Sequence, residues 1–179
     1  LCELLGAEPY LSGNIGSGTV QEMADWVQYT NFASKSPMSD LRKKNGRTEP
    51  WKVKFWGIGN EAWGCGGNMK ADYYAGEYRK YTTFLPGNIT RIASGASSDD
   101  YNWTETLMKN IPHNMMSALA LHHYSVLSWK DTKGPSVGFN EATYFKTMEE
   151  AWKMEEFVTK HSTIMDKYDP DKKVDLIVD

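Results

Sequence analysis

The dipeptide Asn60-Glu61 stands where an aromatic, glycine-rich run ends, in the stretch FWGIGNEAWG at residues 55–64. Between the neighbouring rings of Trp56 and Trp63, a carboxyl group would be partly removed from water, which suits a general acid for the hydrolysis of a sugar. The alternative is a structural carboxylate that caps the following turn or pairs with a basic side chain. The dipeptide alone leaves these two interpretations about equal.

A second group of candidate residues lies in LALHHYS, at the end of another β-type run. Because side chains alternate along a strand, the spacing of two places His122 and Tyr124 on one face. His123 then falls on the opposite face, where a structural role is expected. A histidine pair at a strand end is more often a hydrogen-bonded structural feature than a catalytic one, so the pattern alone favours the structural interpretation.

Asn14 and Cys65 complete the set of side chains whose chemistry needs an interpretation. Asn14, in GNIGSGT, either edges a sugar pocket or forms a turn, and the turn is favoured. Cys65 either lines the site next to Glu61 or packs as a small hydrophobic residue, and packing is favoured. Two cysteines, Cys2 and Cys65, are too few for a disulfide framework, and their spacing does not match a zinc site.

The elements that must position these residues alternate between strand and helix. A Thr19 to Glu22 capping box opens one helix, and a long helix is expected from about 141 to 168, with a break and with Phe145, Met148 and Trp152 on one stripe. The segment with Pro37 and KKNGRTEP is expected to be a polar connection. Five β-type runs separate the helices, at residues 7–14, 53–60, 90–96, 117–125 and 173–179.

Such a βαβ series predicts an α/β fold with a parallel sheet or a barrel. In a (β/α)8 barrel the catalytic residues lie at the C-terminal ends of the strands, where Glu61 and His122 fall. The glycines of GCGGN at 64–68 do not match a nucleotide-binding GxGxxG motif. They are expected to let the backbone turn tightly behind Glu61.

Composition narrows the class of partner. The chain has 179 residues, 40% hydrophobic and 13% aromatic, which is enough for one globular domain with a sizeable core. A net charge of -3 without a basic stripe gives no reason to expect a nucleic acid or an anionic membrane surface. No apolar run reaches the roughly 18 residues of a membrane span. Neutral, polar substrates fit this composition better.

Four segments together resemble glycoside hydrolase family 51, the α-L-arabinofuranosidase family. They are KFWGIGNEAWGCGGNM, LCELLGAEPYLSGNIGSGTVQEMADWVQY, SPMSDLRKKNGRTEPW and LALHHYS. The resemblance implies that residues 1–179 are part of a catalytic (β/α)8 TIM barrel, strands 3 to 7 of 8. The upstream strands, strand 8 and a C-terminal β-sandwich are then expected to lie outside this sequence.

The resemblance also implies roles for individual residues. Glu61 matches the acid/base, Asn60 the residue that binds the sugar 2-hydroxyl, and His122 and Tyr124 a His-x-Tyr pair that positions the sugar and the nucleophile. Asn14 and Trp63 are weaker candidates for contact with the sugar. The nucleophilic Glu is expected directly after Asp179. Asp179 itself is not expected to replace it, because side-chain direction changes with each residue and aspartate is shorter.

The implied function is retaining hydrolysis of terminal non-reducing α-L-arabinofuranosyl groups from arabinan or arabinoxylan saccharides. No metal or organic cofactor is expected, a homo-oligomer is possible, and the resemblance favours a cytoplasmic location. Without the nucleophile, the 179-residue polypeptide is expected to show little turnover. Two alternatives are an endo-β-glucanase or another retaining relative, and a non-catalytic remnant that binds carbohydrate.

Overall fold

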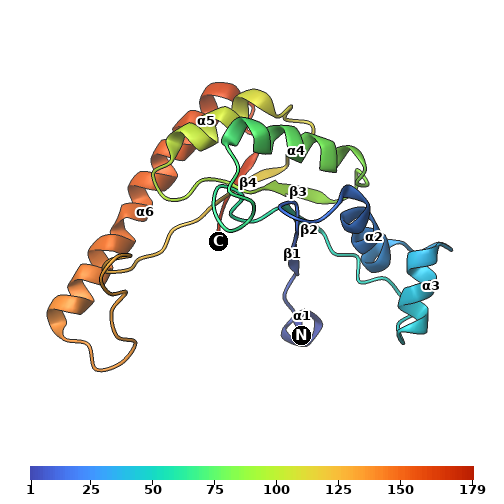
Figure 1. Cartoon of the computed structure of the whole chain (residues 1–179), viewed down its shortest axis with the longest axis horizontal. Helices are drawn as coiled ribbons and strands as arrows, with labels where there is room; N and C mark the ends of the chain where they lie inside the picture. The colour runs from blue at the N-terminus through green and yellow to red at the C-terminus, as the bar shows by residue number, and fades with distance from the viewer.

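The fold is a five-stranded parallel sheet with its strands in sequence order (Figure 1). The computed structural model describes residues 1–179. All five predicted β-type runs are confirmed as strands, although each strand is shorter than its run. The strands are β1 (Tyr10–Gly13), β2 (Phe55–Ile58), β3 (Thr90–Ala93), β4 (Ala118–Leu121) and β5 (Asp175–Val178).

Six helices connect or flank these strands. The predicted capping box is confirmed, since the Thr19 side chain accepts from the backbone N–H of Glu22 and the Glu22 side chain accepts from that of Thr19. The helices are α1 (Cys2–Leu5), α2 (Val20–Asn31), α3 (Pro37–Lys44), α4 (Ala71–Thr83), α5 (Tyr101–Asn110) and α6 (Glu141–Tyr168).

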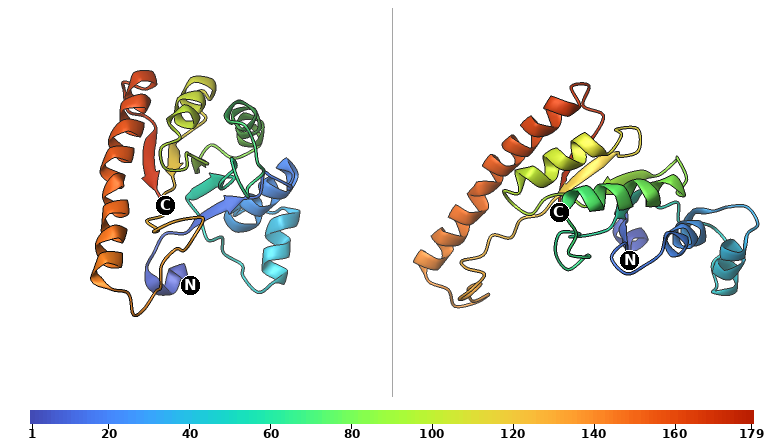
Figure 2. Two further views of the ribbon diagram at one scale, coloured as in Figure 1. Left: turned by 60° about the vertical axis from the view of Figure 1, so that its left-hand side comes forward. Right: turned by 45° about the horizontal axis from the view of Figure 1, so that its top comes forward.

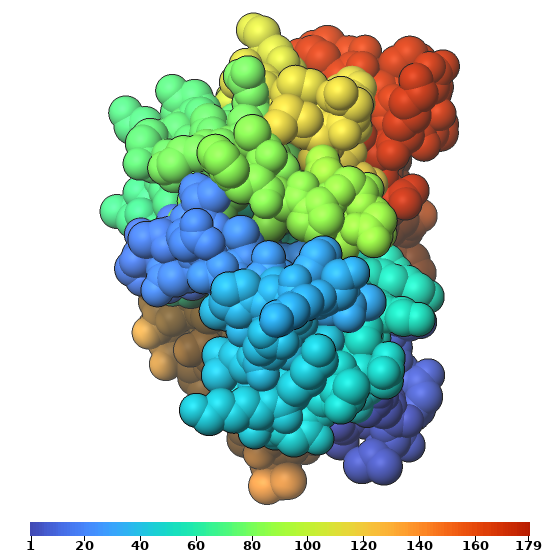
Figure 3. Space-filling model, turned by 90° about the vertical axis from the view of Figure 1, so that its right-hand side faces the viewer, coloured from blue at the N-terminus to red at the C-terminus, as the bar shows by residue number.

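Helix α3 was missed, because residues 37–44 were expected to be a polar connection. The helix has few apolar residues, so its periodic signal is weak, but its cap is strong: Ser36 accepts from the N–H of Ser39, and Pro37 takes the first turn. Arg42 fixes it against α2, since the buried guanidinium donates to the carbonyl oxygens of Tyr29 and Phe32. In Figure 3 this part of the chain, coloured cyan, covers one end of the molecule.

Helix α6 runs without the expected break over 28 residues. Its sequence contains neither proline nor glycine, and the Asn140 side chain caps it by accepting from the N–H of Thr143. Its buried residues, Phe157, His161 and Met165, all lie in its C-terminal half. The other half extends away from the sheet in Figures 1 and 2. No helix of the structure combines the length and the apolar character needed to cross a membrane.

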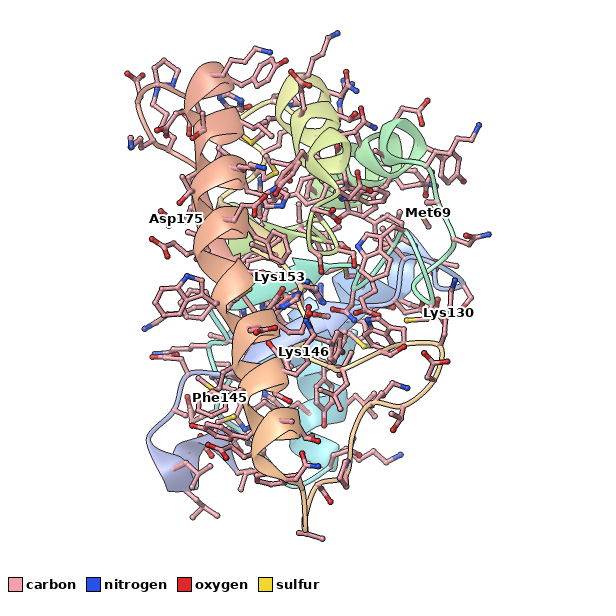
Figure 4. All side chains as sticks on the ribbon, turned by 90° about the vertical axis from the view of Figure 1, so that its left-hand side faces the viewer. Met69, Lys130, Phe145, Lys146, Lys153 and Asp175 are labelled. Atoms are coloured by element: carbon pink, nitrogen blue, oxygen red, sulfur yellow. The ribbon has the colours of Figure 1, made fainter.

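The apolar stripe of Phe145, Met148 and Trp152 lies on that extending half and is exposed. Figure 4 shows Phe145 on this half of α6, nearer the start of the helix than Lys153. The stripe is therefore not part of the core in this structure.

The two faces of the sheet differ. The helix-covered face carries the main core of 25 buried residues, in which strand side chains such as Trp56 and Leu119 pack against α2, α4, α5 and α6. The opposite face is called the open face below. Its small core cluster contains strand residues and no helix residue. That cluster has only three buried residues, Ile92, Ala118 and Ala120, with Tyr10, Phe55 and Ile177 beside them.

Candidate active site

A tight turn after β2 sets the position of Glu61. The Glu61 carbonyl accepts from the N–H groups of Gly64 and Gly66 at 2.8 and 3.0 Å. A Cβ atom on Gly66 would lie 1.8 Å from the Asn60 carbonyl oxygen, so the turn requires glycine at this position. Glu61 itself has φ 45°, a left-handed conformation that costs a non-glycine residue about 1–3 kcal/mol. The expected glycine turn behind Glu61 is confirmed.

Each carboxylate oxygen of Glu61 has its own partner. Oε1 lies 3.3 Å from Nδ1 of His122, and Oε2 accepts from the Cys65 thiol at 3.3 Å. The expectation that Cys65 is packed as a small hydrophobic residue is wrong, because the residue is exposed. The hydrogen bond to Glu61, assisted by burial and by the carboxylate charge, raises the pKa of the Cys65 thiol. The Glu61 side chain is only 17% exposed, so its carboxylate is partly removed from water.

His122 links Glu61 to a second carboxylate. Its Nε2 lies 2.9 Å from Oδ1 of Asp179, which follows β5. The hydrogen bond to Asp179, together with the charges of Asp179 and Glu61, outweighs burial and raises the pKa of His122. Because β4 and β5 pair Leu121 with Val178, the next residue of each strand, His122 and Asp179, falls side by side. The imidazole thus bridges the ends of two neighbouring elements to Glu61.

Sequence reasoning gave Asp179 no role, yet its side chain meets His122 on the open face. Strand alternation would have revealed this, since Asp179 lies two residues after Ile177, which also faces that side. Tyr10 of β1 belongs to the same cluster: burial and the nearby Asp179 carboxylate raise the pKa of its hydroxyl to about 12. Residues from both edges of the sheet therefore approach one another across the open face.

Two further contacts brace the turn that carries Glu61. The Ser94 hydroxyl accepts from the N–H of Ala62 at 3.1 Å, and the Trp63 indole donates to the Gly95 carbonyl at 2.9 Å. The Trp63 ring meets the His122 ring edge-on, with 6.4 Å between centroids. Trp63 therefore lies beside the Glu61–His122 pair, and Asn60 is exposed at the same strand end.

Tyr124 is not brought to this pair. The strand ends at Leu121, and His122 forms only an isolated bridge to Ser97, so the expected alternation does not extend to Tyr124. Tyr124 is 57% exposed, and its ring lies edge-on to that of Trp129, with 5.4 Å between centroids. The expectation that His122 and Tyr124 share a strand face is therefore wrong.

Asn14 and His123 have the structural partners that the sequence favoured. The Asn14 side-chain oxygen accepts from the N–H groups of Gly16 and Ser17, which is a turn contact. His123 Nδ1 lies 3.0 Å from the Ser98 hydroxyl, and its Nε2 donates to the Glu150 carbonyl at 3.0 Å.

The geometry supplies proton-transfer chemistry at the C-terminal edge of the open face. Glu61 can carry or release a proton, and His122 and Cys65 hold its two oxygens. No group of three or more His, Cys, Asp or Glu side chains is placed so that it could hold a metal ion.

A comparison with family models decides the affiliation. The model described as "Alpha-L-arabinofuranosidase 1 domain" matches residues 10–133. The chain belongs to the alpha-L-arabinofuranosidase family. The matched segment includes Glu61, Cys65 and His122, whereas Asp179 lies outside it. The predicted resemblance is confirmed.

Similar proteins agree with the arabinofuranosidase affiliation. An intracellular exo-alpha-L-arabinofuranosidase of Bacteroides ovatus is 51% identical over the whole chain, and alpha-L-arabinofuranosidase C of Emericella nidulans is 52% identical over 60% of it. The crystal structure of the GH51 arabinofuranosidase from Xanthomonas axonopodis pv. citri superposes over 99% of the chain with a TM-score of 0.93 and 43% identity. An arabinose complex of the Thermotoga maritima enzyme gives a TM-score of 0.78 at 28% identity over 99% of the chain.

The chain spans between 23% and 37% of the length of these arabinofuranosidases. It covers 35% of the Bacteroides ovatus protein and 23% of the Emericella nidulans protein. It covers 37% of the Xanthomonas structure and 36% of the Thermotoga maritima structure. The family and the parallel α/β fold are thus established for these 179 residues.

Proposed function

We propose that the protein is an α-L-arabinofuranosidase that removes terminal non-reducing α-L-arabinofuranosyl groups from arabinan- or arabinoxylan-type saccharides, with Glu61 as acid/base. One observation carries the proposal: a carboxylate at the C-terminal end of β2 is held on the open face between His122 and Cys65. The names of the relatives support the substrate class. None of them favours an endo-β-glucanase or a purely carbohydrate-binding role.

We infer that the sheet is strands 3 to 7 of a (β/α)8 barrel. The strand order β1 to β5 never reverses, and the core that contains the helices lies on one face, whereas a doubly wound sheet reverses its order and carries helices on both faces. The approach of Tyr10 on β1 to Asp179 after β5 supports strong curvature, because these residues lie at opposite edges of the sheet. Barrel strands place catalytic groups at their C-terminal ends, where Glu61 and His122 lie.

In the proposed retaining reaction, Glu61 protonates the leaving oxygen and later takes a proton from the attacking water. Asn60, exposed beside Glu61, binds the sugar 2-hydroxyl, and Trp63 walls the pocket. His122 holds Glu61 toward the sugar. Tyr124 and Asn14 stay proposed sugar contacts, although Tyr124 lies beside Trp129 and Asn14 is engaged in its turn. No step of this mechanism calls for a metal ion or an organic cofactor.

Retention needs a second carboxylate about 5–5.5 Å from the first, which attacks the anomeric carbon. Asp179 is already engaged by His122, so it is a poor candidate for that role. The attacking group is instead the glutamate that the family resemblance places directly after Asp179. We therefore expect residues 1–179 by themselves not to complete the covalent step. An intracellular location is proposed from the name of the Bacteroides ovatus relative.

The test replaces Glu61 with Gln in the full-length protein and compares aryl arabinofuranosides of different leaving groups. For a poor leaving group, kcat/KM, which reports the first step, should fall by roughly 10²–10⁴, because protonation by the general acid is lost. For a good leaving group such as dinitrophenol, which departs without a proton, the first step should be far less affected. The NMR spectrum of the first-formed product should show retained anomeric configuration.

Glu155→Gln on the exposed face of α6 is the matched control and should leave both substrates unchanged. An equal loss of kcat/KM for good and poor leaving groups, or no loss, would contradict the assignment of Glu61 as the acid. Inverted product would contradict the retaining mechanism while leaving Glu61 as a possible acid.

A further inference from the structure

The thiol of Cys65 is the partner of Glu61 that the proposed reaction does not use. It comes from the same glycine turn, four residues later, and donates to Oε2, while His122 occupies the opposite oxygen, Oε1. The terminal torsion of a glutamate side chain is broad when nothing holds it. Partners on both oxygens restrict that rotation, so the carboxylate presents a fixed edge to the open face.

The backbone keeps Cys65 in reach of Glu61. The N–H groups of Gly64 and Gly66, on either side of the cysteine, both donate to the Glu61 carbonyl. The Cys65 thiol therefore donates to the side chain of the same residue whose carbonyl oxygen closes the turn. This is a local arrangement within residues 61–66, independent of the contacts between distant strands.

The protonation state of the thiol suits such a role. Because the pKa of Cys65 is raised by its hydrogen bond to Glu61, the sulfur stays protonated and acts as a donor. A thiol is a weak donor. It can orient a carboxylate without strongly favouring the ionised form, and a group that must donate a proton and later accept one needs both forms.

We propose that Cys65 is a positioning residue for the acid/base, whose S–H group fixes the rotation of the Glu61 carboxylate during proton transfer. The inference rests on the proposed function, because the contact between Cys65 and Glu61 can assist catalysis only if Glu61 transfers a proton. It also makes Cys65 sensitive to modification: a group attached to the sulfur removes the donor and occupies space against Oε2. The thiol is exposed, so reagents can reach it.

The first test needs no catalytic activity. The rate at which iodoacetamide alkylates Cys65 is followed by site-resolved mass spectrometry, in the full-length protein and in its Glu61→Gln variant. Loss of the neighbouring charge should increase the thiolate fraction and make alkylation at neutral pH at least about threefold faster. Cys2 in the same samples is the internal reference and should react at an unchanged rate. An unchanged rate at Cys65 would overturn the proposed contact.

The second test asks whether the contact serves catalysis. Cys65→Ala removes the donor, whereas Cys65→Ser keeps one. With a poor leaving group, kcat/KM of Cys65→Ala should fall by about threefold to tenfold, the range of one weak hydrogen bond. With a good leaving group it should change by less than about twofold, and Cys65→Ser should stay within about twofold on both substrates.

The Glu61→Gln variant separates the proposed role of Cys65 from the proposed function. If Glu61→Gln shows the leaving-group dependence and Cys65→Ala loses kcat/KM equally on both substrates, or loses none, then Cys65 is not a positioning residue while the proposed function stands. If Glu61→Gln shows no such dependence, the proposed function itself fails. A circular dichroism spectrum and a melting temperature equal to those of the unmodified protein are required of each variant before its rates are compared.

Discussion

The helix-covered face and the open face of the sheet are built by the same five strands but hold different kinds of residue. On β2, the buried Trp56 and Ile58 face the helices, while Phe55 and Gly57 face the other way. On the first face large apolar side chains exclude water and supply stability. On the second, small side chains leave room, and strand ends carry ionisable groups. Alternation along each strand thus separates stability from chemistry.

Two histidines show the same difference in electrostatic terms. His161 of α6 is fully buried. Its ring nitrogens contact the Thr104 hydroxyl and the Ser98 carbonyl, and burial lowers its pKa. His122 on the open face has two carboxylates within 3.3 Å, and the bond to Asp179 raises its pKa. Burial alone therefore does not set the charge of a histidine here; the charges of its partners do.

The largest expected effect compares how much side chains on the two faces contribute to the stability of the protein. Trp56 is fully buried, donates to the Val53 carbonyl, and touches Trp26 edge-on. Trp56→Ala should lower the free energy of unfolding by about 3–5 kcal/mol, the usual cost of truncating a buried aromatic side chain. Phe55→Ala, one residue earlier on the open face, should cost less than half as much. Urea unfolding of residues 1–179, in which the open face is uncovered, measures both, and equal losses would break the comparison.

A smaller effect is expected from two glycines. Gly66→Ala places Cβ 1.8 Å from the Asn60 carbonyl oxygen, so the turn behind Glu61 must shift, at a cost of about 1–3 kcal/mol and with loss of activity. Gly76, in the middle of α4, has no atom within 4 Å of its would-be Cβ. Gly76→Ala should therefore stabilise the protein by about 0.5–1 kcal/mol and leave kcat unchanged. Full activity in Gly66→Ala would show that the turn tolerates rearrangement.

The smallest effects concern pH and have opposite signs for the two histidines. The lowered pKa of His161 means that its contribution to stability is present above the ordinary value of 6.5 and is lost as the pH falls. The raised pKa of His122 means that its contribution is present below 6.5 and is lost as the pH rises through the folded value. Each change should amount to about 1 kcal/mol or less.

Unfolding free energies measured between about pH 5 and pH 8 check this prediction in two variants. His161→Gln should lose more stability at the higher pH, and His122→Gln more at the lower pH. The same sign of pH dependence in both variants would mean that the carboxylates around His122 do not act on it as the geometry indicates.

Much of the fold follows from local sequence signals. Periodicity in the β-type runs placed all five strands, and the Thr19 capping box located the start of α2. The absence of apolar periodicity hid α3, whose stability comes from its cap and from the burial of Arg42. The long α6 was divided wrongly by a break, although nothing in its sequence interrupts a helix.

The candidate site likewise has a part that local sequence determines and a part that depends on the assembled fold. Asn60, Glu61 and the glycines after them form a local motif, so the sequence itself determined the turn and the carboxylate it carries. The contact of that carboxylate with His122, by contrast, depends on the tertiary structure. His122 and Asp179 become neighbours only because β4 and β5 pair in one register, and Tyr10 joins them only because the sheet curves.

Sequence patterns therefore determined which residues occur at strand ends and which face each strand position takes, because backbone geometry repeats over a few residues. Tertiary structure decided the contacts between residues that are far apart in the chain, such as that of His122 with Oε1 of Glu61, and the exposure of the stripe on α6. Hydrogen bonds and charges act over a few ångströms, and residues far apart in the chain come within that range only when the sheet is assembled.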